Sequence, residues 1–192
     1  MLILASQSPR RSELLRNAGV DFSVAPADID ESLVPGEEPA VYVQRLARGK
    51  ALAVLAKSPA GALVLGADTT VVLDGESLGK PLDEADARQM LGRLRGRSHQ
   101  VMTGVCLAWQ SSKGSQTLVE VEITEVEFAA ISDREIAEYV SSSEPMDKAG
   151  AYGIQGRASR WVPRISGCYF NIVGLPVARV CAMLRRVGDM QR

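Results

Sequence analysis

The sequence predicts an α/β protein with a mixed, twisted sheet, much of it antiparallel, and flanking helices. Helix-like and strand-like patterns alternate along the chain, which favours a layered α/β arrangement. Hairpins are predicted at Asp74-Gly75 and at "SSKGSQ", and the two strands of a hairpin are antiparallel. The chain has 192 residues, of which 46% are hydrophobic and 23% charged. We therefore expect residues 1–192 to form one domain with a packed core.

The first third of the chain carries two strand patterns and two helix patterns. Ser8 is a typical N-cap, Pro9 suits the first helical position, and Gly19 is a typical helix stop. The expected elements are a strand at 2–5, a helix at 9–18, an extended segment at 20–32 and a helix from 39 to about 57.

The segment "GALVLGADTTVVLDGESLGKP" predicts two strands with a break at Gly66-Ala67, followed by the first hairpin turn. Asp83 and Ser132 are typical caps of two further helices, and Ser132 forms a capping box with Glu135. We expect helices from 83 to about 94 and from 132 to about 141, strands at 99–109 and 117–128, two short strands within 161–176, and a last helix from 176 to about 187.

Composition excludes several classes of function. The formal net charge of −1 argues against a broad nucleic-acid-binding or membrane-binding surface. No apolar stretch has the length of a membrane span or of a signal-peptide core. His99 is the one histidine and the three cysteines are scattered, so the sequence indicates no zinc site. We expect a soluble, cytoplasmic protein.

Two arginines stand at an unfavourable place for a helix. Arg10 and Arg11 lie in the predicted first turn, where the helix dipole already places positive charge. Free backbone N–H groups at a helix start bind anions, and guanidinium groups bind phosphate in bidentate fashion. The pair therefore indicates a phosphate site, although two solvated arginines would have the same pattern.

Three other segments carry chemistry-bearing residues. Asp68 stands among small residues and Lys80 follows in the same hairpin, which suits proton transfer or metal binding beside a cation. In "DKAGAYGIQG" the glycines allow close approach to a ligand, and Gln155 carries a donor and an acceptor that suit the edge of a base. The alternatives are an Asp bonded within a turn, a surface lysine and a flexible connection. Glu31 and Lys50 are weaker candidates, because each alone resembles a solvated residue.

Together, "ASQSPRR", "YVQRLARGKA", "GADTTVVLDGESLGKP", "DKAGAYGIQG" and "YFNIVGLP" resemble the Maf family in the same order and over nearly the whole chain. The resemblance implies a mixed α/β fold related to inosine-triphosphate pyrophosphatases, with two lobes around a cleft. It also implies a nucleoside triphosphate pyrophosphatase that uses a divalent metal cation, Mg²⁺ or Mn²⁺, and forms a homodimer.

Within the family, "GADT" and "KAGAYGIQG" look like the branch that acts on dTTP and UTP. The branch that acts on 7-methyl-GTP carries a Ser-Asp-Gln triplet and a Glu where this chain has Ala67-Asp68-Thr69 and Gln155. The resemblance implies Asp68 as proton acceptor and metal ligand, with Glu31 as a further metal-supporting residue. The substrate-binding residues that it implies are Arg10, Arg11, Lys50, Thr69, Lys80 and Gln155.

The expected reaction is hydrolysis of dTTP and UTP between the α and β phosphates, giving a monophosphate and pyrophosphate, with removal of non-standard pyrimidine nucleotides as a possible role. Two alternatives stay open at this point: a 7-methyl-GTP pyrophosphatase, and a non-catalytic nucleotide-binding inhibitor of septum formation.

Overall fold

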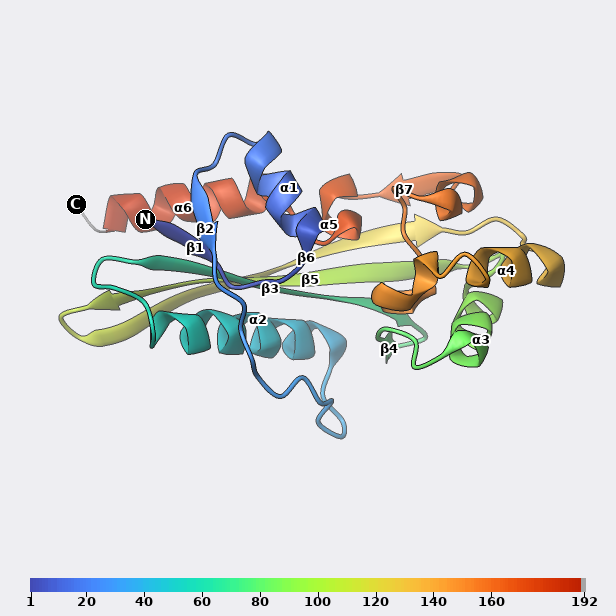
Figure 1. The fold of residues 1–192 in the computed structure, drawn as a ribbon, viewed down its shortest axis with the longest axis horizontal. Helices are drawn as coiled ribbons and strands as arrows, with labels where there is room; N and C mark the ends of the chain where they lie inside the picture. The colour runs from blue at the N-terminus through green and yellow to red at the C-terminus, as the bar shows by residue number, and fades with distance from the viewer. Residues whose placement is uncertain (191–192) are drawn as a thin grey trace.

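A long mixed sheet runs through the molecule, with helices on both of its faces (Figure 1). The computed structural model describes residues 1–190. The strands are β1 Leu2–Leu4, β2 Phe22–Val24, β3 Leu63–Leu73, β4 Glu76–Leu78, β5 Ser98–Ser111, β6 Gly114–Glu127 and β7 Arg164–Ser166. The helices are α1 Pro9–Asn17, α2 Pro39–Leu55, α3 Glu84–Leu94, α4 Asp133–Val140, α5 Tyr169–Val173 and α6 Val177–Met190, with 3-10 turns η1 Glu144–Asp147, η2 Ala149–Ala151 and η3 Arg157–Trp161.

The strand order is β2-β1-β3-β5-β6-β7, and β4 also pairs with β3. The β1 strand is parallel to β2 and β3, whereas every other pairing is antiparallel. This arrangement confirms the predicted mixed sheet with flanking helices.

One edge of β3 is only partly covered. The β5 strand follows the other edge from Leu63 to Val72. On the partly covered edge, β1 pairs with residues 63–65 and β4 with residues 71–73. On this edge the stretch Gly66–Thr70 therefore lies between two short neighbours with no strand beside it, which leaves an opening in the sheet.

The predicted break at Gly66-Ala67 is wrong, because β3 runs through both residues. Gly66 serves helix packing instead: a Cβ there would lie 2.1 Å from the carbonyl oxygen of Ala47 on α2. Gly104 on β5 has the same role, because its Cβ would lie 2.2 Å from the carbonyl oxygen of Val43. These two glycines let α2 lie directly against the centre of the sheet.

The buried residues form separate clusters on the two sides of the opening. One contains Leu4, Leu15, Leu107 and Met183 and joins β1, α1 and α6 to the sheet. Another contains Leu91, Phe128, Tyr139 and Trp161 and joins α3 and α4 to the far end of the sheet. This division gives the two lobes that the sequence resemblance implies, one at each end of the sheet in Figure 1.

Local capping signals gave accurate helix starts. Ser8 accepts a hydrogen bond from the backbone N–H of Arg11, and Ser132 and Glu135 form the predicted capping box. The second of the short strands expected within 161–176 is wrong, because Tyr169–Val173 is helical. Within residues 1–190, no helix combines the length and apolar character needed to cross a membrane.

Replacing Gly66 by Ala should destabilise the fold by about 3 kcal/mol, because the new Cβ meets backbone atoms of α2 that cannot move independently. Urea unfolding gives the measurement. Gly92→Ala is the matched control: a Cβ there meets nothing within 4 Å, and the change should stabilise α3 by about 0.5–1 kcal/mol. Equal stability of the two variants would contradict the packing role of Gly66.

Candidate active site

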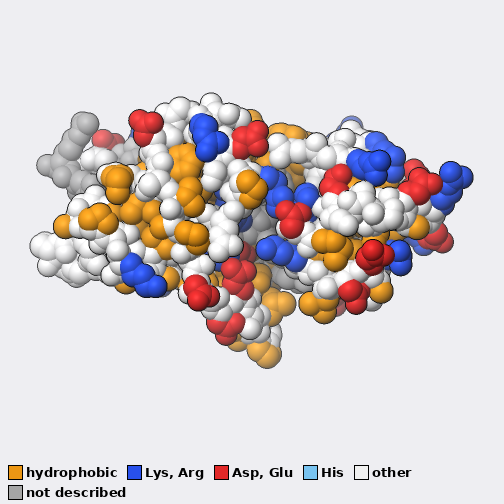
Figure 2. Space-filling model, viewed as in Figure 1, with side chains coloured by type: hydrophobic (Ala, Val, Ile, Leu, Met, Phe, Trp, Pro, Cys, Tyr) orange, Lys and Arg blue, Asp and Glu red, His pale blue; other side chains and the backbone are white. Residues whose placement is uncertain are grey.

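A cleft of about 870 Å³ opens at the uncovered stretch of β3. Residues 5–11 line one side, and Gly79-Lys80 with Glu144, residues 147–149 and residues 152–156 line the other. Figure 2 shows Lys and Arg side chains gathered around a hollow near the centre of this face, with Asp and Glu side chains beside them. The cleft brings together every site residue predicted from the sequence: Arg10, Arg11, Glu31, Lys50, Asp68, Thr69, Lys80 and Gln155.

A buried ammonium group lies at the floor of this cleft. Lys50 reaches from α2, and its Nζ lies 2.6 Å from Oδ1 of Asp68 and 2.7 Å from Oε1 of Glu31. Lys50 and Asp68 are each only 8% exposed. A buried charge needs a partner of opposite sign, and each of these two supplies it for the other.

The same geometry fits a divalent cation. Asp68 and Glu31 direct carboxylate oxygens at one positive charge. Mg²⁺ in proteins is commonly held by one or two carboxylates together with substrate phosphates and water. Within residues 1–190 no cluster of three or more His, Cys, Asp or Glu side chains is arranged for a metal ion. The two carboxylates therefore suit a metal that a phosphate ligand helps to hold.

The guanidinium group of Arg11 bonds to protein groups beside the cleft. Its guanidinium donates four hydrogen bonds, to the carbonyl of Gly174 at 2.8 Å, that of Ala67 at 2.9 Å, and the hydroxyls of Ser6 and Thr69 at 3.1 Å. Ala67 belongs to the uncovered edge of β3, so this arginine takes the place of a missing strand partner. Burial of the group lowers the pKa of Arg11 from its ordinary value.

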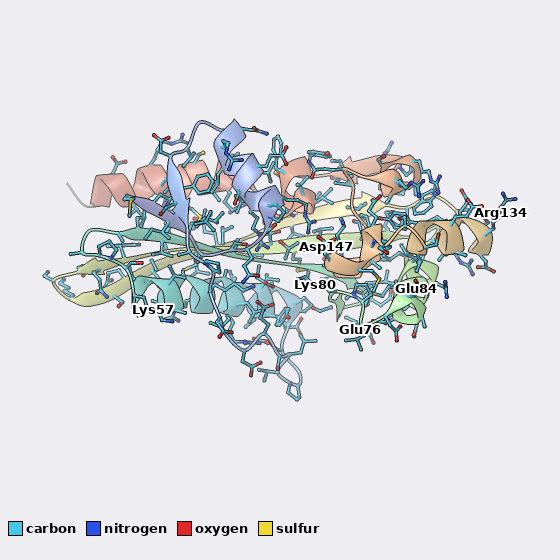
Figure 3. The ribbon with its side chains drawn as sticks, in the orientation of Figure 1. Lys57, Glu76, Lys80, Glu84, Arg134 and Asp147 are labelled. Atoms are coloured by element: carbon cyan, nitrogen blue, oxygen red, sulfur yellow. The ribbon has the colours of Figure 1, made fainter. Side chains whose placement is uncertain are left out.

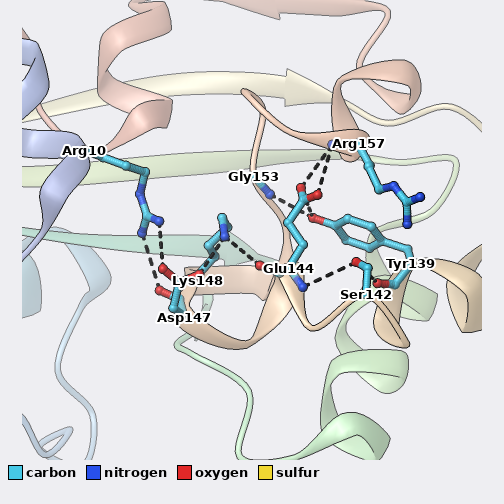
Figure 4. A network of polar contacts seen from close by, with 8 residues as sticks. All are labelled: Arg10, Tyr139, Ser142, Glu144, Asp147, Lys148, Gly153 and Arg157. Atoms are coloured by element: carbon cyan, nitrogen blue, oxygen red, sulfur yellow. Dashed lines mark hydrogen bonds and ion pairs between the residues drawn. The ribbon is translucent and has the colours of Figure 1, made fainter.

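Arg10 spans the cleft. Its Nη1 lies 2.8 Å from Oδ2 of Asp147, at the end of η1 on the opposite side, and Lys148 contacts the other oxygen at 2.6 Å (Figure 4). Burial raises the pKa of Asp147, but hydrogen bonds from Lys148 and Arg10 outweigh it and lower that pKa to about 2. Asp147 therefore stays ionised and holds two cations at the entrance.

The remaining predicted residues are accessible to a ligand. Lys80 is exposed and has no ion-pair partner within residues 1–190, and Figure 3 shows it near Asp147 at the middle of the molecule. Thr69 bonds to the hydroxyl of Thr103 at 2.9 Å, on the sheet face opposite to that of Asp68. Gln155 is exposed in the glycine-rich segment.

Several cleft residues are absent from the predicted set. Tyr42, Glu144 and Tyr152 also line the cleft, and Asp147 and Lys148 were seen only as part of the glycine-rich motif. Tyr42 lies on the apolar face of α2, where its pattern is that of a core residue. The role of Glu144 is not visible in the local sequence, because the partners of its carboxylate come from α4 and from residue 157.

These features define a class of protein: an α/β protein with a cation-lined cleft suited to a small anionic ligand and with a buried carboxylate paired with a lysine at its floor. The chain belongs to the Maf family, since the family model described as "Maf-like protein" matches residues 1–187. The resemblance found in the sequence motifs is thereby confirmed.

Relatives with assigned names cover nearly the whole chain. The dTTP/UTP pyrophosphatase of Koribacter versatilis is 58% identical over 97% of this chain and 94% of its own length. That of Symbiobacterium thermophilum is 57% identical over the same shares, and that of Citrifermentans bemidjiense is 51% identical over 98% and 96%. Among solved structures, the Staphylococcus aureus Ham1 protein matches with a TM-score of 0.47 and 18% identity, covering 67% of this chain and 71% of that one.

Arg11→Lys should destabilise the protein by about 3 kcal/mol, because a single ammonium group cannot reproduce four forked hydrogen bonds. The measurement is the urea midpoint. Arg16→Lys, an exposed position on the same helix, is the control and should change stability by less than about 0.5 kcal/mol. If both variants unfold alike, the four hydrogen bonds of Arg11 do not stabilise the fold.

Proposed function

We propose that this protein is a nucleoside triphosphate pyrophosphatase that hydrolyses dTTP and UTP to the monophosphate and pyrophosphate. The observation that carries the proposal is Asp68, a buried carboxylate oriented by Lys50 in a cleft lined by cations. The names of relatives that are 51–58% identical support the choice of nucleotides.

The charges of the cleft suit a triphosphate. Lys80 offers an exposed ammonium, and Arg10 and Lys148 share one exposed carboxylate that incoming phosphates can replace as their partner. The start of α1 lies beside them and adds backbone N–H groups. Such fixed donors stabilise the charge that develops on the departing pyrophosphate at no cost of rearrangement during the reaction.

In the proposed reaction Asp68 acts on water. Its Oδ1 accepts the hydrogen bond of Lys50, which leaves Oδ2 as the acceptor for a proton from the attacking water. The water oxygen forms a bond to the α phosphorus as the bond from that phosphorus to the bridging oxygen breaks. The proton passes to Asp68, and pyrophosphate leaves with the bonding electrons.

We propose Asp68 and Glu31 as the residues that hold a divalent cation, Mg²⁺ or Mn²⁺. The ion supplies positive charge to the phosphates and raises the acidity of water. Lys50 holds these two carboxylates together in the free protein and so keeps them close enough to share a cation.

Base choice rests on Gln155 and Thr69. Uracil and thymine present an imide edge with one donor and two acceptors, and the Gln155 amide can match a donor and an acceptor of it. Two alternatives remain as outcomes of experiment: a 7-methyl-GTP pyrophosphatase and a nucleotide-binding inhibitor of septum formation without turnover. Asp68 disfavours the second, because a pure phosphate binder gains nothing from a carboxylate beside its ligand. We also propose a homodimer acting in the cytoplasm.

Pyrophosphate release from a panel of nucleoside triphosphates tests the proposal, with Mg²⁺, with Mn²⁺ and with a chelator. We expect dTTP and UTP to be hydrolysed faster than CTP, the purine nucleotides and 7-methyl-GTP, and only when a metal is present. Faster turnover of 7-methyl-GTP would refute the substrate choice, and no release from any nucleotide would refute the enzyme.

Asp68→Asn should lower kcat about 10²- to 10⁴-fold, because the amide cannot accept the proton. The fold should survive, since Asn can still accept the hydrogen bond of Lys50, and circular dichroism with thermal melting checks this. Asp74→Asn in the exposed hairpin turn is the control and should keep normal turnover. A folded Asp68→Asn protein with near-normal kcat is incompatible with the mechanism.

A further inference from the structure

Hydrogen bonds hold the segment 153–157, which carries Gln155, at both of its ends. The backbone N–H of Gly153 donates to the hydroxyl of Tyr139 at 3.2 Å. The backbone N–H of Arg157 donates to both oxygens of Glu144, at 3.1 and 3.3 Å (Figure 4). Between these points the N–H of Gly156 donates to the carbonyl of Gly153 at 3.0 Å, closing a turn.

Tyr139 and Glu144, the two side chains that hold this segment, are also hydrogen-bonded to each other. The hydroxyl of Tyr139 donates to Oε1 of Glu144 at 3.0 Å. Tyr139 is 1% exposed and packs edge-on against Trp161, which restricts movement of its ring. Burial raises the pKa of Tyr139, which keeps the hydroxyl protonated and able to donate. Glu144 therefore has a rigid anchor.

Gly153 and Gly156 leave the space that the side chains of Lys148 and Glu144 occupy. A Cβ on Gly156 would lie 1.9 Å from Oε1 of Glu144, so the carboxylate occupies the space that a side chain would need. A Cβ on Gly153 would lie 2.7 Å from Cε of Lys148, whose Nζ in turn donates to the backbone carbonyl of Glu144 at 2.6 Å. The two glycines thus allow these side chains to pack against the segment, and they need not indicate a flexible loop.

We propose that Glu144 and Tyr139 are positioning residues that fix where the Gln155 amide lies in the cleft, and so determine discrimination between pyrimidine bases. Their side chains bond to each other and to the backbone N–H groups on either side of Gln155, and both act through that backbone. This inference rests on the proposed function for its substrates. It predicts a loss of selectivity rather than a uniform loss of rate.

The test compares kcat/KM for UTP and CTP in Glu144→Ala, Glu144→Gln and Tyr139→Phe. Glu144→Ala should lower the UTP-to-CTP ratio by about tenfold to about a hundredfold, because a small displacement of a contact group has effects of that size. Glu144→Gln keeps an acceptor for Arg157 and should recover most of the ratio. Glu138→Ala, which removes an exposed ion pair on α4, is the matched control and should leave the ratio unchanged.

A double-mutant cycle tests whether the effect of Glu144 passes through Gln155. In a Gln155→Ala background, Glu144→Ala should change the ratio no further, because its effect passes through that amide. Equal losses of kcat/KM for UTP and CTP would overturn the inference, since general loosening of the fold produces that result. So would an unchanged ratio in both Glu144→Ala and Tyr139→Phe.

Failure of the proposed function has a different signature. In that case the unmodified protein releases no pyrophosphate from either nucleotide. Equilibrium binding of UTP and CTP by calorimetry to the same variants then gives the ratio of affinities. An affinity ratio that falls in Glu144→Ala and returns in Glu144→Gln supports the positioning role, and one that does not move refutes it.

Discussion

The uncovered edge of β3 is the constraint on which the rest of the site depends. Because β1 ends at Leu4, opposite Leu65, and β4 ends at Leu78, opposite Val71, the stretch Gly66–Thr70 has no strand on one side. Unpaired backbone groups at a sheet edge must find other partners. Arg11 supplies one of them at Ala67, and the rest of the opening becomes the cleft. An irregularity of strand length therefore creates the site and places Asp68 within it.

The close approach of α2 gives that opening its electrostatic character. Gly66 and Gly104 remove the side chains that would hold the helix away from the sheet. Lys50 then reaches Asp68 from a position that is itself buried. A buried ion pair adds little net stability, because desolvation of both groups offsets their attraction. Its value here is orientation: the carboxylate has one fixed direction before any ligand arrives.

The far side of the cleft is organised by the short turn η1. Glu144 at its start holds the segment that carries Gln155, and Asp147 at its end holds Arg10. Two side chains that can contact a ligand are thus attached to one turn, although α1 and the glycine-rich segment are far apart in the sequence. Movement of η1 would displace both together, so the entrance and the base-contacting amide are mechanically linked.

By itself the sequence determined what depends on neighbours along the chain: the N-cap at Ser8, the capping box at Ser132, the hairpin at Asp74-Gly75 and the family motifs. Only the tertiary structure decided what joins distant segments. Gly66 resembled a strand break because a local pattern cannot show a helix packed against it. Arg11 pointed to phosphate binding, and its bonds to Ala67 and Gly174 exist only once α1, β3 and the end of α5 come together. Periodicity and capping are encoded locally, whereas the choice of partner across the sheet depends on how the whole chain packs.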